Sequence, residues 1–175
     1  MPNLIQSLRA HDLAHLRIVA GLWGGELISG ESEAALKELT TALLDPGLVR
    51  EVMDSLPGEA RSALEDLGEA GSRIPWVIFA RQYGEIRPAG AGRRDREQLY
   101  LNPISTAETL FYRAFLARAF FDTPNGAQEF AYIPDDLAKI LEQKRQKEHQ
   151  GEPPEPQASA KGIIPEPPGR LATPR

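Results

Sequence analysis

Apolar residues recur at helical spacing along the first seventy residues of the chain. Leu13, Leu16 and Val19, for example, lie three residues apart and share one face of a helix. The pattern predicts four helices, at 10–23, 32–44, 46–55 and 57–71. Asp45 followed by Pro46 is a typical helix start, because Asp caps a helix and Pro suits its first turn. We therefore expect a helical N-terminal region over residues 1–57.

The elements change in kind after the fourth helix. The pattern predicts a bridging strand at 73–75, a helix at 75–83, a helix at 106–118, a β-hairpin over 119–133 and a last short helix from 135. Ser105 and Glu108 have the spacing of a capping box, and Asn125-Gly126 favours a tight turn. This order is typical of a winged helix-turn-helix, in which the third helix can enter the DNA major groove and the hairpin forms the wing.

The predicted fold class is therefore mainly α, with a helical N-terminal bundle packed on a winged helix-turn-helix that carries a small β-hairpin wing. We expect the winged-helix-like domain to span residues 58–142. Residues 143–175 are expected to form a disordered, Pro-rich tail or linker, because seven prolines and three glycines lie between 151 and 175. Such a tail is compatible with a fragment whose linker leads to another domain.

Composition excludes several classes of protein. The chain of 175 residues has no cysteine, which excludes disulfides, cysteine nucleophiles and thiolate metal sites. No apolar stretch approaches the roughly 18 residues that a membrane helix needs, and the N-terminus has no secretion-signal pattern. The sequence thus predicts a soluble, cytoplasmic protein without a membrane partner.

Charge is distributed unevenly along the chain, although the formal net charge is only -5. Residues 26–69 contain eleven acids and three bases, which gives 3 - 11 = -8. Residues 73–118 contain eight bases and four acids, which gives 8 - 4 = +4, and all eight bases are arginine. Arginine presents a planar fork that can hold a phosphate or a carboxylate at two points.

The arginines concentrate in residues 81–98, a segment with three glycines and no apolar run. Three interpretations remain open for it: a loop that docks on phosphates, an ion-paired surface loop, or a plain linker. On the first interpretation the predicted nucleic-acid-binding residues come from this segment and from the third helix of the winged helix. They are Arg87, Arg93, Arg94, Arg96, Thr109 and Arg113. The predicted hairpin, by contrast, is acidic at Asp122 and Glu129 and contributes no base.

Four stretches resemble one group of bacterial proteins. They are SLRAHDLAHLRIVAGLWG, IPWVIFARQYGEIRPAGAGRRDRE, NPISTAETLFYRAFLARAFFDT and EFAYIPDDL, within residues 7–138. The group is described as carrying the N-terminal domain of XPB-type DNA helicases, or as helicase-associated. The resemblance implies a DNA-transaction context and a helicase as a possible partner. It implies no ATPase, because the sequence lacks the G-x-x-x-x-G-K-[ST] phosphate loop.

Catalytic chemistry has little support in the sequence. His11 and His15 have the spacing of the zinc-protease helix H-E-x-x-H, but Asp12 stands where that motif needs the longer Glu. We interpret them as two surface histidines flanking a core helix, with a metal-dependent hydrolase as a minor alternative. No nucleophile, base and orienting group come together in the sequence. We therefore expect no enzyme, no cofactor and no metal.

The predicted function is a non-enzymatic winged-helix accessory module of a helicase-associated, DNA-transaction or transcription-related protein. Its predicted partners are duplex DNA and a helicase or another protein. The alternative is a protein–protein interaction scaffold that uses the winged helix without direct DNA contact.

Overall fold

Four helices form the N-terminal part of the chain in the computed structural model, which describes residues 1–151. They are α1 (Leu4–Leu8), α2 (Leu13–Leu22), α3 (Ser32–Leu43) and α4 (Pro46–Ser55). Asn3 and Gln6 form a capping box at the start of α1. Asp45 caps α4 by accepting a hydrogen bond of 3.0 Å from the Gly47 N–H, as the sequence predicts. Helix α1, with five residues, is too short for a periodic pattern to reveal.

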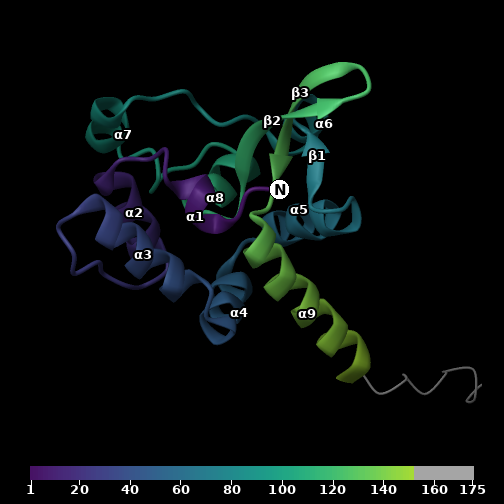
Figure 1. Cartoon of the computed structure of the whole chain (residues 1–175), viewed down its shortest axis with the longest axis horizontal. Helices are drawn as coiled ribbons and strands as arrows, with labels where there is room; N and C mark the ends of the chain where they lie inside the picture. Colours follow the sequence, from purple (N-terminus) through teal and green to yellow (C-terminus); the bar gives the residue numbers. More distant parts are fainter. Residues whose placement is uncertain (152–175) are drawn as a thin grey trace, which may run out of the picture. The chain divides into compact units, whose positions relative to one another are not determined.

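Five further helices and three strands follow. They are α5 (Gly58–Glu69), β1 (Arg73–Pro75), α6 (Trp76–Tyr83), α7 (Ala91–Glu97), α8 (Thr106–Tyr112), β2 (Ala117–Thr123), β3 (Gly126–Tyr132) and α9 (Asp135–Gly151). The part of the chain that the structure describes is thus mostly helical, with one small antiparallel sheet (Figure 1). This confirms the prediction of a mainly α fold.

The sheet has the strand order β1-β3-β2. In the hairpin, Ala117 lies opposite Tyr132 and Thr123 opposite Gly126, while the short β1 pairs only with the end of β3. Strand β2 therefore lies at an edge of the sheet, with β3 on one side of it (Figure 1). Because side chains alternate along a strand, Phe120 projects from one face of β2 and is 71% exposed.

Residues Met1–Gln143 form one compact unit with a shared apolar core. Helix α8 lies within it and packs against α2, α5 and α6. The chain start is joined to the start of α9: the Leu4 N–H donates to the Asp136 carboxylate at 2.8 Å, and the Asp135 N–H donates to the Pro2 carbonyl at 3.0 Å. The boundary between residues 57 and 58 stays a prediction.

The end of α9 differs from the expected end of the folded region. The helix continues to Gly151 and thus extends into the range predicted as a tail. Residues from Lys144 on belong to a second unit, and residues 152–175 of the predicted tail lie outside the described residues.

Helix α8 is shorter than the 106–118 that its apolar pattern predicts. Ala114 has a φ of 62°, which breaks the helix and turns the chain into β2. Phe115 and Leu116 are nevertheless buried, at 0% and 2% exposure. The apolar residues that continue the helical pattern therefore fill the core from a non-helical backbone, which spacing alone does not reveal.

Gly84, which follows α6, lies against Ser105, which precedes α8. Its φ is +89°, and a Cβ built on it would lie 2.4 Å from the Ser105 Cβ. Only glycine fits this close approach without strain. The contact brings the beginning of the arginine segment against the N-terminus of α8.

Candidate functional site

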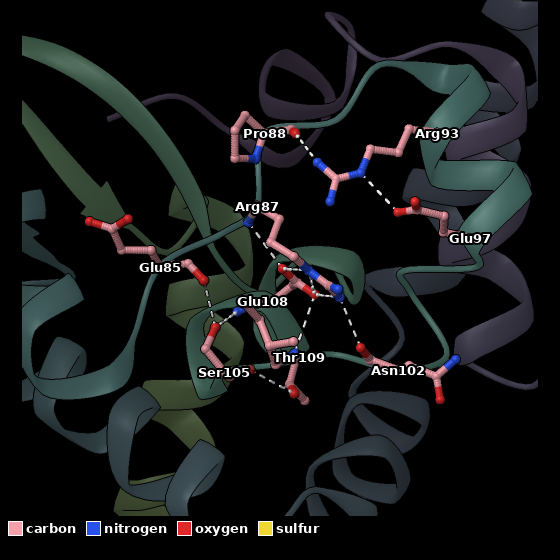
Figure 2. Close-up of polar contacts among 10 residues, drawn as sticks. Glu85, Arg87, Pro88, Arg93, Glu97, Asn102, Ser105, Glu108 and Thr109 are labelled. Carbon is pink, nitrogen blue, oxygen red and sulfur yellow. Dashed lines mark hydrogen bonds and ion pairs between the residues drawn. The ribbon is translucent and has the colours of Figure 1, made fainter.

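Arg87 lies against Glu108 of α8 (Figure 2). Its Nε donates to the two carboxylate oxygens at 3.1 and 3.0 Å, and its Nη2 also donates to Oε1. The Arg87 backbone N–H donates to Oε2 at 3.0 Å, and Nη2 reaches the Asn102 carbonyl at 2.8 Å. The guanidinium thus fastens the segment before α7 to the segment before α8.

Glu108 is a fully buried carboxylate, with 0% of its side chain exposed. Burial alone raises the pKa of Glu108, but the hydrogen bonds from the Arg87 side chain and backbone outweigh it and hold the pKa below its usual value. Ser105 caps α8 through the Glu108 N–H at 3.0 Å, as the sequence predicts. The Glu108 carboxylate, however, accepts hydrogen bonds from Arg87 and does not complete the capping box.

Arg94 is buried in α7, with 6% of the residue exposed. Its Nη1 and Nη2 donate to the two oxygens of Asp12 at 2.7 and 3.0 Å, and its Nε donates to Asp95 at 2.9 Å. The hydrogen bond from Arg94 lowers the pKa of Asp12 to about 2. This two-point pair fastens α7 to the start of α2, so Arg94 is occupied within the chain.

Arg93 and Arg96 lie on the exposed side of α7. Arg93 donates to Glu97 at 2.8 Å and to the Pro88 carbonyl at 3.3 Å (Figure 2). The hydrogen bond from Arg93 lowers the pKa of Glu97. Arg96 is exposed, and within residues 1–151 its guanidinium has no hydrogen bond or ion pair at contact distance. Arg96 is therefore the arginine of this segment most open to an external anion.

Thr109 and Arg113 are engaged within and beside α8. The Thr109 hydroxyl donates to the Ser105 carbonyl at 3.1 Å, and Arg113 Nη1 donates to the Thr109 carbonyl at 3.1 Å. The Arg113 carbonyl accepts a hydrogen bond of 2.8 Å from Trp23 Nε1. Burial lowers the pKa of Arg113. Both residues are partly buried, so the structure does not gather the six predicted residues on one open face.

The prediction that His11 and His15 are both surface histidines is wrong for His15. His15 is only 3% exposed, so it is not a surface residue. Its ring stacks on that of His11, with centroids 4.0 Å apart, and both rings contact Phe111. Burial lowers the pKa of His15 from 6.5 to about 3, which keeps the ring neutral. The prediction failed because Phe111 and Tyr112, far away in sequence, cover the ring.

Among the residues that the structure describes, His11 and His15 have no third side chain beside them that would complete a metal site. Within residues 1–151 no group of three or more His, Cys, Asp or Glu side chains is placed to hold a metal ion. Asp12, between the histidines in sequence, caps α2 and pairs with Arg94. The arrangement is thus a buried contact between α2, α7 and α8.

Sequence reasoning missed Asp12 and Glu108 as the partners of the arginines. Glu108 carried a signal, because it lies among Ala107, Leu110 and Tyr112 on an apolar helix, where a charged residue needs a buried partner. Asp12 carried none, because a helix cap explains an aspartate at that position fully. Which arginine each acid meets depends on tertiary contacts across 21 and 82 residues.

A groove of about 710 Å³ lies between α1, the last turn of α8 and the edge strand β2. Phe111 and Tyr132 line it together with the small residues Ala117 and Ala119. Arg118 also lines it, and this residue belongs to β2, so the hairpin is not free of basic residues as the sequence pattern suggested. No Asp or Glu is among the groove's lining residues, which suits a ligand that is not cationic.

In the described part of the chain, no helix has the length and apolar character needed to cross a bilayer. The chain matches no family model, no curated protein and no solved structure.

Proposed function

We propose that the chain is a non-enzymatic accessory module whose winged-helix-like part docks a partner protein. The order α5, β1, α6, α8, β2, β3 is the one expected for a winged helix. Helix α7 would then be an insertion in the connection between the second and third helices. The wing would be the β2–β3 hairpin.

One observation carries the proposal: α8, the helix that would read DNA, is covered. In a DNA-reading winged helix the third helix enters the major groove. Here α2 packs on α8. Trp23, directly after α2, donates a hydrogen bond of 2.8 Å from Nε1 to the Arg113 carbonyl. Phe111 also contacts His11 and His15. Entry into a groove would require α2 to leave, so docking by another face is favoured.

The exposed face of α6 is the best candidate for that docking. Val77 and Ile78 are 65% and 55% exposed, although each is a large apolar side chain. Arg81 follows one turn later on the same helix and is also exposed. The face therefore suits an apolar surface of a partner protein that places a carboxylate opposite Arg81.

Duplex DNA remains a second candidate because Arg96 is exposed and its guanidinium forms no hydrogen bond or ion pair at contact distance within residues 1–151. Arg93 lies beside it in an exposed ion pair, which costs little to exchange for a phosphate. The resemblance to helicase-associated proteins would place either function in a DNA transaction, with a helicase as the natural first partner to test.

Photo-crosslinking tests the docking proposal. A photoreactive residue replaces Ile78 in the full chain, or Ile104 as a control of similar exposure. A partner crosslinked from position 78 is then purified and titrated. The Val77→Ser/Ile78→Ser variant should bind it at least roughly tenfold more weakly, and the control Leu101→Ser/Ile104→Ser should bind normally. Equal losses in both variants, or no specific crosslink from position 78, would contradict the proposal.

Fluorescence anisotropy with labelled duplex at low and moderate salt separates the two candidates. If the chain docks a partner protein through α6, we expect no salt-dependent DNA binding through α7. The DNA candidate predicts binding that the Arg93→Ala/Arg96→Ala variant loses, with a salt slope smaller by about two. The control Arg50→Ala/Arg61→Ala removes two exposed arginines elsewhere and should leave such binding intact.

A further inference from the structure

Among residues 1–151, no strand pairs with one of the two edges of β2, although β2 is seven residues long. Such an edge presents backbone N–H and C=O groups that another strand can pair with. Its sequence, ARAFFDT, contains no proline and no lysine, the residues that usually protect an edge. Phe120, at the centre of the strand, is 71% exposed. The edge is thus open and apolar at its middle.

The side chains of β2 are self-complementary about Phe120. If two copies of β2 pair antiparallel with Phe120 opposite Phe120, then Arg118 of each copy lies opposite Asp122 of the other. Residues directly opposite project from the same face and touch, so both charge pairs form on the face that carries the two rings. On the other face, the small Ala119 lies opposite the large Phe121.

The surroundings of the strand admit this second copy. The groove of about 710 Å³ runs beside Ala117, Arg118 and Ala119, the first half of the β2 edge. In the two-fold arrangement the groove receives the second half of the other strand, with its Phe121 next to Phe111 and Tyr132. Asp122 is exposed, and within residues 1–151 it has no ion pair or side-chain hydrogen bond to give up. Arg118 already contacts Glu129 of β3 through Nε at 2.9 Å and Nη2 at 2.8 Å and lies over the Trp76 ring, so Asp122 of the other copy would share this guanidinium with Glu129.

We propose that the chain forms a two-fold symmetric dimer in which two β2 strands pair antiparallel about Phe120 and join the two three-stranded sheets into one of six strands. Two opposite-charge pairs, Arg118 with Asp122 of the other copy, fix the register. The interface is isologous and closes on itself, as expected for a dimer with two-fold symmetry.

Sedimentation velocity of the full chain over a range of concentrations tests the dimer. The wild type should associate, and Phe120→Asp should remain monomeric. Asp122→Arg places arginine opposite arginine twice and should raise the dimer Kd roughly tenfold or more. The control Glu51→Arg makes the same change of charge on an exposed face of α4 and should dimerise as the wild type does. Circular dichroism confirms that each variant is folded.

Mixing two variants tests the register itself. In a homodimer of either Asp122→Arg or Arg118→Asp, the residues at positions 118 and 122 of the two copies have the same charge and face each other. A mixed dimer of the two variants places opposite charges together at both positions. Equimolar mixing should therefore restore association that neither variant shows alone. The Arg118→Asp/Asp122→Arg double variant should also restore it, which covers the case in which Arg118→Asp alone folds poorly.

Three results would overturn the proposal. The first is a wild type that stays monomeric up to roughly 1 mM, which would leave the edge to a strand from another protein. The second is a dimer that neither Phe120→Asp nor Asp122→Arg weakens. The third is a dimer that Asp122→Arg weakens but that neither mixing nor the double variant restores.

Discussion

At the scale of single residues, Glu108 accepts hydrogen bonds from the Arg87 side chain and from the backbone N–H groups of Arg87 and Ile104. No water replaces these contacts easily, because the Glu108 side chain is fully buried. Exposed ion pairs of the same two residue types, such as Arg93 with Glu97, compete with solvent and stabilise a fold little. These two Arg–Glu pairs, whose arginines are Arg87 and Arg93, thus have different roles.

Glu108→Ala should destabilise the fold by on the order of 2 kcal/mol or more, because it leaves buried donors without an acceptor. Glu97→Ala, the matched control in the exposed pair, should change the stability little. Guanidinium-induced unfolding followed by circular dichroism measures both. Similar unfolding free energies for the two variants would show that the Arg87–Glu108 contact is not structural.

His15 should make the stability depend on pH. Its pKa is lowered from 6.5 to about 3 in the folded chain, so below pH 6.5 the unfolded chain binds a proton that the folded chain does not. The free energy of unfolding should therefore fall as the pH falls from 6.5 toward 3, by up to about 1.4 kcal/mol per pH unit. His11, whose pKa is also lowered by burial, adds to the loss in the same direction.

The pH effect has a clear window and control. Asp12, Glu97 and Glu108, whose pKa values are lowered from 3.8, 4.5 and 4.5, add losses only near and below those ordinary values, so unfolding between roughly pH 5.5 and 7 reports the histidines. His15→Gln should flatten the dependence, whereas His149→Gln, at an exposed position of α9, should preserve it. A wild-type stability that stays constant over this window would contradict the burial of a neutral His15.

At the scale of elements, Gly84 and Gly92 belong to the same glycine-rich segment but meet different surroundings. Gly84 has a φ of +89° and lies against Ser105, whereas a Cβ on Gly92, inside α7, would meet no atom within 4 Å. Gly84→Ala should therefore destabilise the fold by about 2–3 kcal/mol. Gly92→Ala should stabilise it by about 0.5–1 kcal/mol, because alanine favours a helix. Thermal unfolding should move in opposite directions for the two variants.

The sequence predicted those elements whose apolar spacing matches their packing. Helices α3 and α4 begin and end almost where the pattern places them. Helix α7 was not predicted, because its residues lack an apolar face and its anchor, Arg94, finds Asp12 across 82 residues. The same long-range pairing explains why the candidate site was predicted only as five arginines and Thr109, without their acidic partners. Their acidic partners, and the cover over α8, depend on tertiary contacts that spacing does not encode.

At the scale of the whole molecule, the two tryptophans lie on either side of the predicted boundary at residues 57 and 58. Trp23 stacks on Phe115, and Trp76 packs near Phe79 and under Arg118. Since both belong to one apolar core, they should report the same unfolding transition. Fluorescence of the single-tryptophan variants Trp23→Phe and Trp76→Phe should give coincident denaturation curves. Two separated midpoints would instead indicate two domains that unfold independently.

The hydrogen bond from Leu4 to Asp136 has a consequence for synthesis of the chain. Helix α1 is made well before α9, and the carboxylate that accepts its N–H emerges more than 130 residues later. At about 5–20 residues per second, the ribosome needs roughly ten seconds to deliver it. During that time α1, whose Leu4 and Leu8 are buried in the finished fold, can pack on α3 but lacks the carboxylate that accepts its N–H. A chaperone that recognises short apolar segments would find α1 incompletely bound during this interval.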